Sequence, residues 1–391
     1  MIYFYFPSKD TTIYEEHTSK NTGKDEIIEL TKITSGSTRR DESGAIYSET
    51  FNTRILTKFN YTDLSASIVD GTIPKFSTGS TTSASACMKL HVSHETAITD
   101  EETIEMRPVS TSTQQVWTEG FGRDKNVNEA GLAISEQGAT WLNANIATGT
   151  LWNTVRHAGA GYNNNWATNS GGGTWHQNST FPGASGSQDL STVSGDLSID
   201  ITTGIEKHLD GTINNDGWII KRTDANEISS TRYGSHKYFS LDTHTIYAPK
   251  LEVKWDDSSH SPGTLTELTE NNILVYPKNN AGEYKKDSRE RISVMGREKY
   301  PTKTYATSSD YSTVKYLPTT SYWGIKDMHT EEYVIDFDTD YTKISCDADG
   351  NYFNLWMDGL QPERYYKFVF RVDRGTRKQY FDEDFAFKIV R

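Results

Sequence analysis

Short bursts in which apolar and polar residues alternate recur along almost the whole chain, and no long stretch keeps a helical spacing. The first burst places Ile2, Phe4 and Phe6 two residues apart, and another runs through residues 27–33. A period of two is typical of a strand with one buried and one exposed face. Turn-forming residues separate the bursts, as at 19–23. This pattern excludes a mainly helical fold and predicts an all-β protein.

The same pattern predicts most of the individual strands. They are residues 2–6, 27–33, 52–59, 88–92, 103–108, 197–201, 217–221, 238–241, 251–255, 291–294, 333–337, 342–346, 351–356, 365–372 and 385–390. One short helix is expected at residues 200–209, where Ile201, Ile205 and Leu209 recur at helical spacing. The chain contains no fixed-period repeat, which disfavours solenoids and propellers.

The composition supports a strand-rich fold and limits the kinds of molecule that the protein is expected to bind. The 391 residues include 22 Tyr, 15 Phe and 9 Trp, and aromatic side chains suit a pleated, half-buried surface. The net charge of −13 argues against a protein that grips a phosphate backbone, so no nucleic-acid partner is predicted. The two cysteines, Cys87 and Cys346, make neither a disulfide framework nor a metal quartet.

A chain of this length has room for two or three domains. Residues 256–263 form a charged break rich in Ser, Pro and Gly, and apolar patterning restarts at residues 273–276. We therefore predict a first β-sandwich over residues 1–256, a linker over 257–263 and a second, immunoglobulin-like β-sandwich over 264–391.

The N-terminus has no basic leader and no small-residue cleavage site, so we expect a first strand there rather than a signal peptide. No stretch approaches the apolar length that a membrane span needs. We therefore expect a soluble chain without membrane insertion.

Between residues 110 and 195 the pattern changes to Gly, Asn, Ser and Thr, and this stretch contains Trp117, Trp141, Trp152, Trp166 and Trp175. It is too long and too irregular for a plain connector. We predict long loops on one side of a sandwich, held in place by tryptophans.

These aromatic residues allow two interpretations. Trp152, Tyr162, Trp166 and Trp175 could form a platform on which sugar rings stack, and they are the candidate glycan-binding residues. Alternatively, large aromatic side chains under long loops act as a small satellite core that holds the loops down.

The sequence lacks the usual catalytic motifs. It has no Gly-rich loop that ends in Gly-Lys-Ser/Thr, and residues 183–187 lack the last glycine of a nucleophile elbow. Acidic pairs such as those at 100–102 and 331–332 are expected by chance among 53 acidic residues. We predict no enzyme, no catalytic residue and no cofactor. A glycan-degrading enzyme, which needs two opposed carboxylates, is the least implausible enzymatic alternative.

Two segments superficially suggest metal ligands. His91 and His94 lie three apart on a predicted strand, where they point to opposite faces. Asp347 begins a segment like a calcium loop, but Tyr352 stands where that loop requires glycine. We predict no metal site, and a turn between two strands near Asp349.

Four phrases resemble a known family in the order in which they occur. They are Phe6-Pro-Ser-Lys-Asp-Thr-Thr-Ile13, Asn52-Thr-Arg-Ile-Leu-Thr-Lys-Phe59, Trp117-Thr-Glu-Gly120 and Leu197-Ser-Ile-Asp-Ile-Thr202. Together they resemble the DNRLRE-type module, a jelly roll similar to carbohydrate-binding modules. The resemblance covers residues 1–256 and implies that the first β-sandwich is jelly-roll-like with long loops.

Further phrases resemble structural proteins of marine, T4-like tailed phages, which couple such a module to a C-terminal β domain. These phrases are Trp117-Thr-Glu-Gly-Phe-Gly-Arg-Asp124, Gly138-Ala-Thr-Trp-Leu142, Ala248-Pro-Lys-Leu-Glu-Val-Lys-Trp-Asp256 and Leu360-Gln-Pro-Glu-Arg-Tyr-Tyr366. The resemblance implies a multi-copy virion component of the neck, tail or baseplate, made in the host cytoplasm. Its partners would be other virion proteins and copies of itself. The alternative is a host-glycan-binding adhesin or decoration protein on the virion surface.

Overall fold

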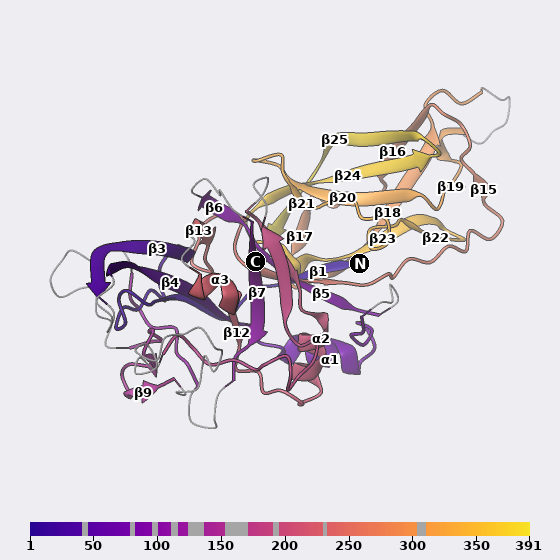
Figure 1. The fold of residues 1–391 in the computed structure, drawn as a ribbon. Coiled ribbons are helices and arrows are strands. Elements are labelled where there is room, and N and C mark those ends of the chain that lie inside the picture. The colour runs from indigo at the N-terminus through magenta and orange to yellow at the C-terminus, as the bar shows by residue number, and fades with distance from the viewer. Residues whose placement is uncertain are drawn as a thin grey trace. The chain divides into compact units, whose positions relative to one another are not determined.

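The computed structural model describes residues 1–391 except 41–45, 79–82, 96–100, 111–115, 124–136, 153–170, 191–194, 230–232 and 303–309. Most of the regular structure in the described part is strand (Figure 1). The prediction of an all-β sandwich fold is therefore confirmed.

The chain divides into two compact units. Unit 1 consists of Met1–Phe4, Gly79–Ala84 and Val253–Arg391, and unit 2 of Tyr5–Thr78 and Ser85–Glu252. The division near residue 252 lies close to the expected break at 256. The first four residues, however, belong to the unit that contains the C-terminal part of the chain, which the sequence did not indicate.

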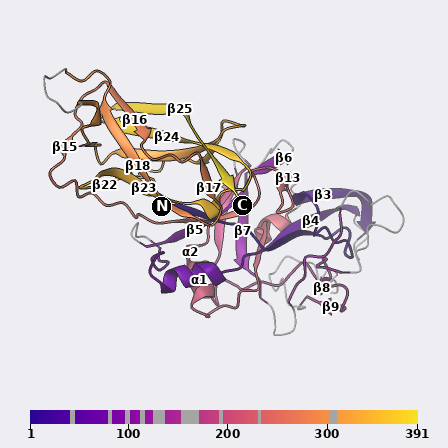
Figure 2. The ribbon, with the colours of Figure 1, turned by 180° about the vertical axis from the view of Figure 1, so that it is seen from behind.

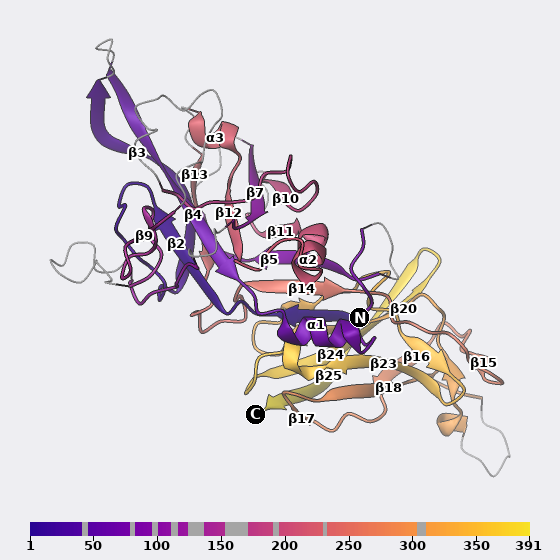
Figure 3. The same cartoon turned by 90° about the horizontal axis from the view of Figure 1, so that it is seen from below.

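Unit 2 contains a large sheet with the order β10-β7-β12-β4-β3-β13-β6, in which β2 also pairs with β4. In a second sheet, β14, β5 and β11 are neighbours. The elements are β2 (Lys9–Tyr14), β3 (Ile27–Arg40), β4 (Ile46–Lys58), α1 (Thr62–Val69), β5 (Ser85–Leu90), β6 (Val92–Glu95), β7 (Glu102–Pro108), β8 (Asn143–Asn145), β9 (Thr150–Leu151), β10 (Gly186–Leu190), β11 (Leu197–Asp200), α2 (Thr202–Leu209), β12 (Trp218–Arg222), α3 (Asp224–Ile228), β13 (Gly234–Phe239) and β14 (Lys250–Lys254). Figure 3 shows β3 and β4 running side by side as a long antiparallel pair.

The irregular segment of unit 2 packs around buried tryptophans. Trp117, Trp141, Trp152 and Trp175 share one apolar cluster with Ile219 of β12 and with other buried residues of β2 and β4. The predicted arrangement, long loops held by tryptophans, is therefore found at these four positions.

Unit 1 is a sandwich of two sheets. One has the order β15-β19-β18-β23-β22 with β16 on β18, and the other β17-β25-β24-β20-β21. The strands are β1 (Ile2–Tyr5), β15 (Thr266–Glu267), β16 (Ile273–Pro277), β17 (Glu283–Lys285), β18 (Arg289–Glu298), β19 (Lys315–Tyr316), β20 (Ser321–Asp327), β21 (Tyr333–Ile335), β22 (Ser345–Asp347), β23 (Gly350–Trp356), β24 (Tyr365–Arg374) and β25 (Arg377–Val390). Figure 2 shows β24 and β18 in separate layers.

Both sheets of unit 1 supply residues to one apolar core, which is what makes them a sandwich. Trp323 of β20 stacks on Phe353 of β23 with ring centroids 4.6 Å apart, and Phe368 of β24 stacks on Phe387 of β25 at 4.3 Å. Ile2 and Phe4 belong to the same core.

The segment that we predicted to be a linker, residues 257–263, is packed into unit 1. The amide of Ser261 donates to the carbonyl of Cys346, and the Asp257 carboxylate lies 2.9 Å from the nitrogen of Met1. These contacts fix the segment in place, so it does not act as a free connector.

Several elements escaped the sequence pattern. The strands β2 and β20 and the helix α1 were not predicted. In β2 the alternation is masked by four polar residues at its start, and in β20 Gly324 interrupts the apolar run. The predicted helix is confirmed as α2, and the predicted turn after Asp347 is confirmed, since Asp347 pairs with Gly350 across it.

Candidate functional site

A stack of alternating cations and aromatic rings lies in the interior of unit 2. The guanidinium of Arg54, from β4, is 4.7 Å from the ring centroid of Trp141 and 5.0 Å from that of Trp175. The ammonium of Lys221, from β12, is 5.1 Å from the ring of Trp175. Desolvated contacts of this kind are among the stronger cation–π interactions. The four side chains thus attach two loop tryptophans to two strands.

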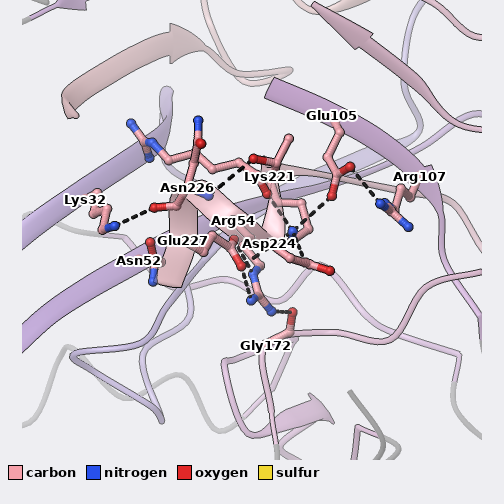
Figure 4. Close-up of polar contacts among 12 residues, drawn as sticks. Lys32, Asn52, Arg54, Glu105, Arg107, Gly172, Lys221, Asp224, Asn226 and Glu227 are labelled. Carbon is pink, nitrogen blue, oxygen red and sulfur yellow. Dashed lines mark hydrogen bonds and ion pairs between the residues drawn. The ribbon is translucent and has the colours of Figure 1, made fainter. Parts of the chain in front are cut away.

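Carboxylates neutralise the two cations of this stack (Figure 4). Arg54 makes a two-point ion pair with Glu227 of α3, with N–O distances of 2.9 and 2.7 Å. Lys221 lies 3.0 Å from Glu105 and 2.8 Å from Asp224. Arg54 also donates to the carbonyl of Gly172, which ties the loop backbone to the same group. We call Arg54, Glu105, Lys221, Asp224 and Glu227 the clasp.

Local sequence explains why these groups meet. All five residues of β12 are buried, so Lys221 must find its partners inside the protein. The helix α3 begins directly after β12, and the Thr223 side chain caps it by accepting a bond from the amide of Asn226. This turn brings Glu227 back over β12 and β4. Lys32 of β3 donates to the carbonyls of Asn226 and Ser229 at the end of α3, and burial lowers the pKa of Lys32 to about 8.

A second buried charge group lies on neighbouring strands. Arg222 of β12 and His236 of β13 both contact the carboxylate of Glu102, at the start of β7. Burial acts to raise the pKa of Glu102, but hydrogen bonds and charge attraction from His236 and Arg222 outweigh it and hold the pKa below its usual value. Glu102 is therefore an ionised, fully paired carboxylate at neutral pH.

The clasp is a set of ion pairs that connects separate elements of unit 2. Each of its carboxylates is paired with Arg or Lys. Separating one partner of a buried pair leaves the other charge uncompensated, so these pairs oppose rearrangement of the elements that carry them. The clasp holds α3, β4, β7, β12 and the loop at Gly172 in fixed positions relative to one another.

The candidate glycan-binding residues fall into two groups. Trp152 is 1% exposed and donates from its indole nitrogen to the Thr140 carbonyl, and Trp175 is 6% exposed. Their rings are covered by protein, as the loop-holding interpretation expects. Tyr162 and Trp166 lie outside the described residues.

The other segments singled out in the sequence do not converge on a metal site. Within the described ranges, no group of three or more His, Cys, Asp or Glu side chains could hold a metal ion. His91 instead lies 3.4 Å from Asp196 and packs edge-on against Tyr247. Among the described residues, no helix combines the length and apolarity that crossing a membrane would require.

No residue of the clasp was predicted to belong to a site. Arg54 lies within one predicted strand, and Lys221 ends another. One signal was available: β12 carries Lys221 and Arg222 directly after Trp218-Ile-Ile220, in a strand otherwise apolar enough to be buried. Cations in such a strand require buried carboxylates as partners. Which carboxylates they are depends on the fold.

Comparisons with known proteins assign this chain to no family. No family model matches it, and no curated protein matches it. Among solved structures, a DUF4785 family protein from Legionella pneumophila aligns with 8% sequence identity and a TM-score of 0.16. The alignment covers 100% of this chain, which spans 62% of that protein's length. A likeness this weak carries no argument about fold or function.

Proposed function

We propose that this chain is a non-enzymatic structural subunit of a tailed-phage virion, present in several copies in the neck, tail or baseplate. The observation that supports it best is the clasp. Buried ion pairs and cation–π contacts connect the described loop residues Trp141, Gly172 and Trp175 to strands of unit 2, and a rigid building block needs such connections. The sequence resemblance to tailed-phage proteins supplies the biological setting.

The partners in this proposal are other virion proteins and copies of the chain itself. Repeated contacts between unlike faces build rings when the rotation closes. Described loop residues that are fixed by buried contacts, such as Trp141 and Trp175, lose little conformational entropy on assembly. The proposal therefore accounts for the anchoring of these residues.

The proposal is tested on purified particles of the phage that encodes the chain. Quantitative mass spectrometry against the major capsid protein should find the chain at a constant ratio that corresponds to a ring or to vertex symmetry. Cryo-electron microscopy should then place it at the neck, tail or baseplate. Absence of the chain from particles purified to constant composition would overturn the proposal.

The alternative, a decoration protein that binds host glycan, makes a different prediction for the same maps. Density for the chain would project from the particle instead of lying between other subunits. In that position many weak sites on one particle would act together, so modest single-site affinity would be enough.

A further inference from the structure

The outer face of the sheet β17-β25-β24-β20-β21 in unit 1 carries aromatic rings that the core does not use. Side chains alternate across a strand, and Trp323, Phe368 and Phe370 point into the core. Their neighbours therefore point outward. The strand register aligns Tyr322 of β20 with Arg371 of β24, and Arg371 with Tyr380 of β25, so these three side chains form one row across three strands.

A strip of rings continues from the end of this row. The ring of Phe337 is 5.9 Å from that of Tyr380 and 5.6 Å from that of Tyr333. Phe337 lies over Gly324, where an added Cβ would come within 3.4 Å of the ring edge. Tyr380 is 57% exposed and Tyr333 is 41% exposed. The two ends of the strip thus present ring surface to solvent, with Phe337 between them.

Two cations make close contacts with these rings. The guanidinium of Arg371 is 4.5 Å from the ring centroid of Tyr322 and 5.1 Å from that of Phe337. The ammonium of Lys326 is 4.8 Å from the ring of Tyr333. Tyr322 and Arg371 are only 5% and 8% exposed, so they form a buried base beside the strip. The contact with Lys326 restrains the exposed ring of Tyr333, so less entropy is lost when a ligand stacks on it.

The charges on this face neutralise one another. Lys326 and Lys367 share the Asp382 carboxylate, at 2.5 and 2.9 Å. Lys367 also lies 2.6 Å from Glu331, and Arg371 lies 3.2 Å from Asp373. In these pairs three cations face three carboxylates, and Asp336 is a further carboxylate near Tyr333. Paired charges of this kind attract ions only weakly over a distance, but they offer donors and acceptors beside the rings.

We propose that this outer face binds a neutral oligosaccharide, with sugar rings stacked on Tyr333 and Tyr380 and hydroxyls bonded by the charged groups between them. The apolar faces of a sugar match exposed rings, and its hydroxyls match a balanced set of donors and acceptors. A protein partner fits less well, because the centres of protein interfaces are depleted of charged residues, whereas Lys326, Lys367 and Asp382 lie next to the rings. This site is separate from the candidate tryptophans of unit 2.

The test is affinity electrophoresis of the full chain through native gels that contain dextran, mannan, galactan or xylan. We expect at least one of these neutral polysaccharides to retard the protein. The double variant Tyr333→Ala/Tyr380→Ala should lose about tenfold or more in affinity, as expected when stacking rings are removed. Tyr380→Phe should retain binding because the ring face remains.

The matched control is Tyr300→Ala, which removes a tyrosine of unit 1 that is 77% exposed and lies elsewhere in the sequence. It should bind like the unchanged chain, and thermal unfolding should show that all variants remain folded. Lack of retardation by every polysaccharide would overturn the proposal, as would equal losses in the control and the double variant.

Sedimentation velocity separates this proposal from one other use of the face. If the unchanged chain self-associates and the double variant does not, while neither is retarded, the face is a contact between copies and the glycan proposal fails. Both measurements use isolated protein. Their outcome is therefore independent of whether the chain is found in a virion.

Discussion

Arg54 of β4 and Glu227 of α3 lie 173 residues apart in the chain and form a two-point ion pair in which both side chains are 1% exposed. The pair connects a central strand of the large sheet of unit 2 to the short helix α3, which Lys32 and Lys221 also contact. Its geometry leads to the first two predictions.

Replacing Arg54 with Met should destabilise unit 2 strongly. Glu227 would remain buried without its two-point partner, with Lys221 at 3.5 Å, and breaking one side of a buried pair costs about 3–5 kcal/mol. Urea unfolding followed by circular dichroism measures this loss. The control is Arg291→Met, which removes the partner of Asp347 from an ion pair whose side chains are 47% and 32% exposed and should cost less than about 1 kcal/mol. Similar losses in both variants would contradict the assignment of Arg54 as a buried anchor.

Removing both partners should be less harmful than removing one. In Arg54→Met/Glu227→Gln the carboxylate that Arg54 paired with is removed together with it, so the double variant should be more stable than the sum of the two single losses predicts. Coupling between groups in direct contact is typically about 0.5–3 kcal/mol. A double-mutant cycle by urea unfolding gives this coupling energy, and strict additivity would show that the pair is not formed in solution.

The loop contact of Arg54 can be probed at Gly172. A Cβ there would lie 2.2 Å from a guanidinium nitrogen of Arg54, and the residue has a φ of +79°. Gly172→Ala should therefore destabilise unit 2 by more than about 1 kcal/mol and increase quenching of tryptophan fluorescence by acrylamide. Gly211→Ala is the control, because its φ is +80° and nothing lies within 4 Å of the added atom. Equal effects would mean that backbone conformation, not contact with Arg54, explains the loss.

His208 should make stability depend on pH. Burial lowers its pKa to about 4 from the ordinary value of 6.5, and its ring lies 4.9 Å from that of Trp218. Between these two values the unfolded chain binds a proton that the folded protein does not, so stability falls as the pH is lowered from about 7 towards 4. The expected loss from this residue is on the order of 2–3 kcal/mol.

His208→Phe tests this prediction, since it keeps a ring at the site and removes the titration. Unfolding free energies measured in urea at pH 7 and pH 5 should differ less in this variant than in the unchanged chain. Replacement of the exposed His94 by Phe serves as the control and should leave the pH dependence as it is. An unaltered pH dependence in His208→Phe would show that the burial of His208 does not contribute.

The fold class and most of the strands follow from local patterns in the sequence. Alternation with a period of two is a local property, and a strand that buries one face must show it. The short helix α2 and the turn after Asp347 were likewise visible because helical spacing and turn residues act over a few positions. The tryptophans of the irregular segment could be assigned to loops for the same reason. The sequence could not show whether they form a stacking platform or a buried anchor, because both roles require the same residue type.

Which residues from distant parts of the chain come into contact depends on the tertiary structure. The clasp joins Arg54, Glu105 and Glu227 from three separate parts of the chain, and nothing local marks one carboxylate among 53 acidic residues as a partner. The first strand likewise packs in unit 1, because Ile2 and Phe4 are part of the apolar core of that unit. This placement depends on complementary shape between residues far apart in the sequence. The row of Tyr322, Arg371 and Tyr380 depends on strand register, which is set only when three strands pair.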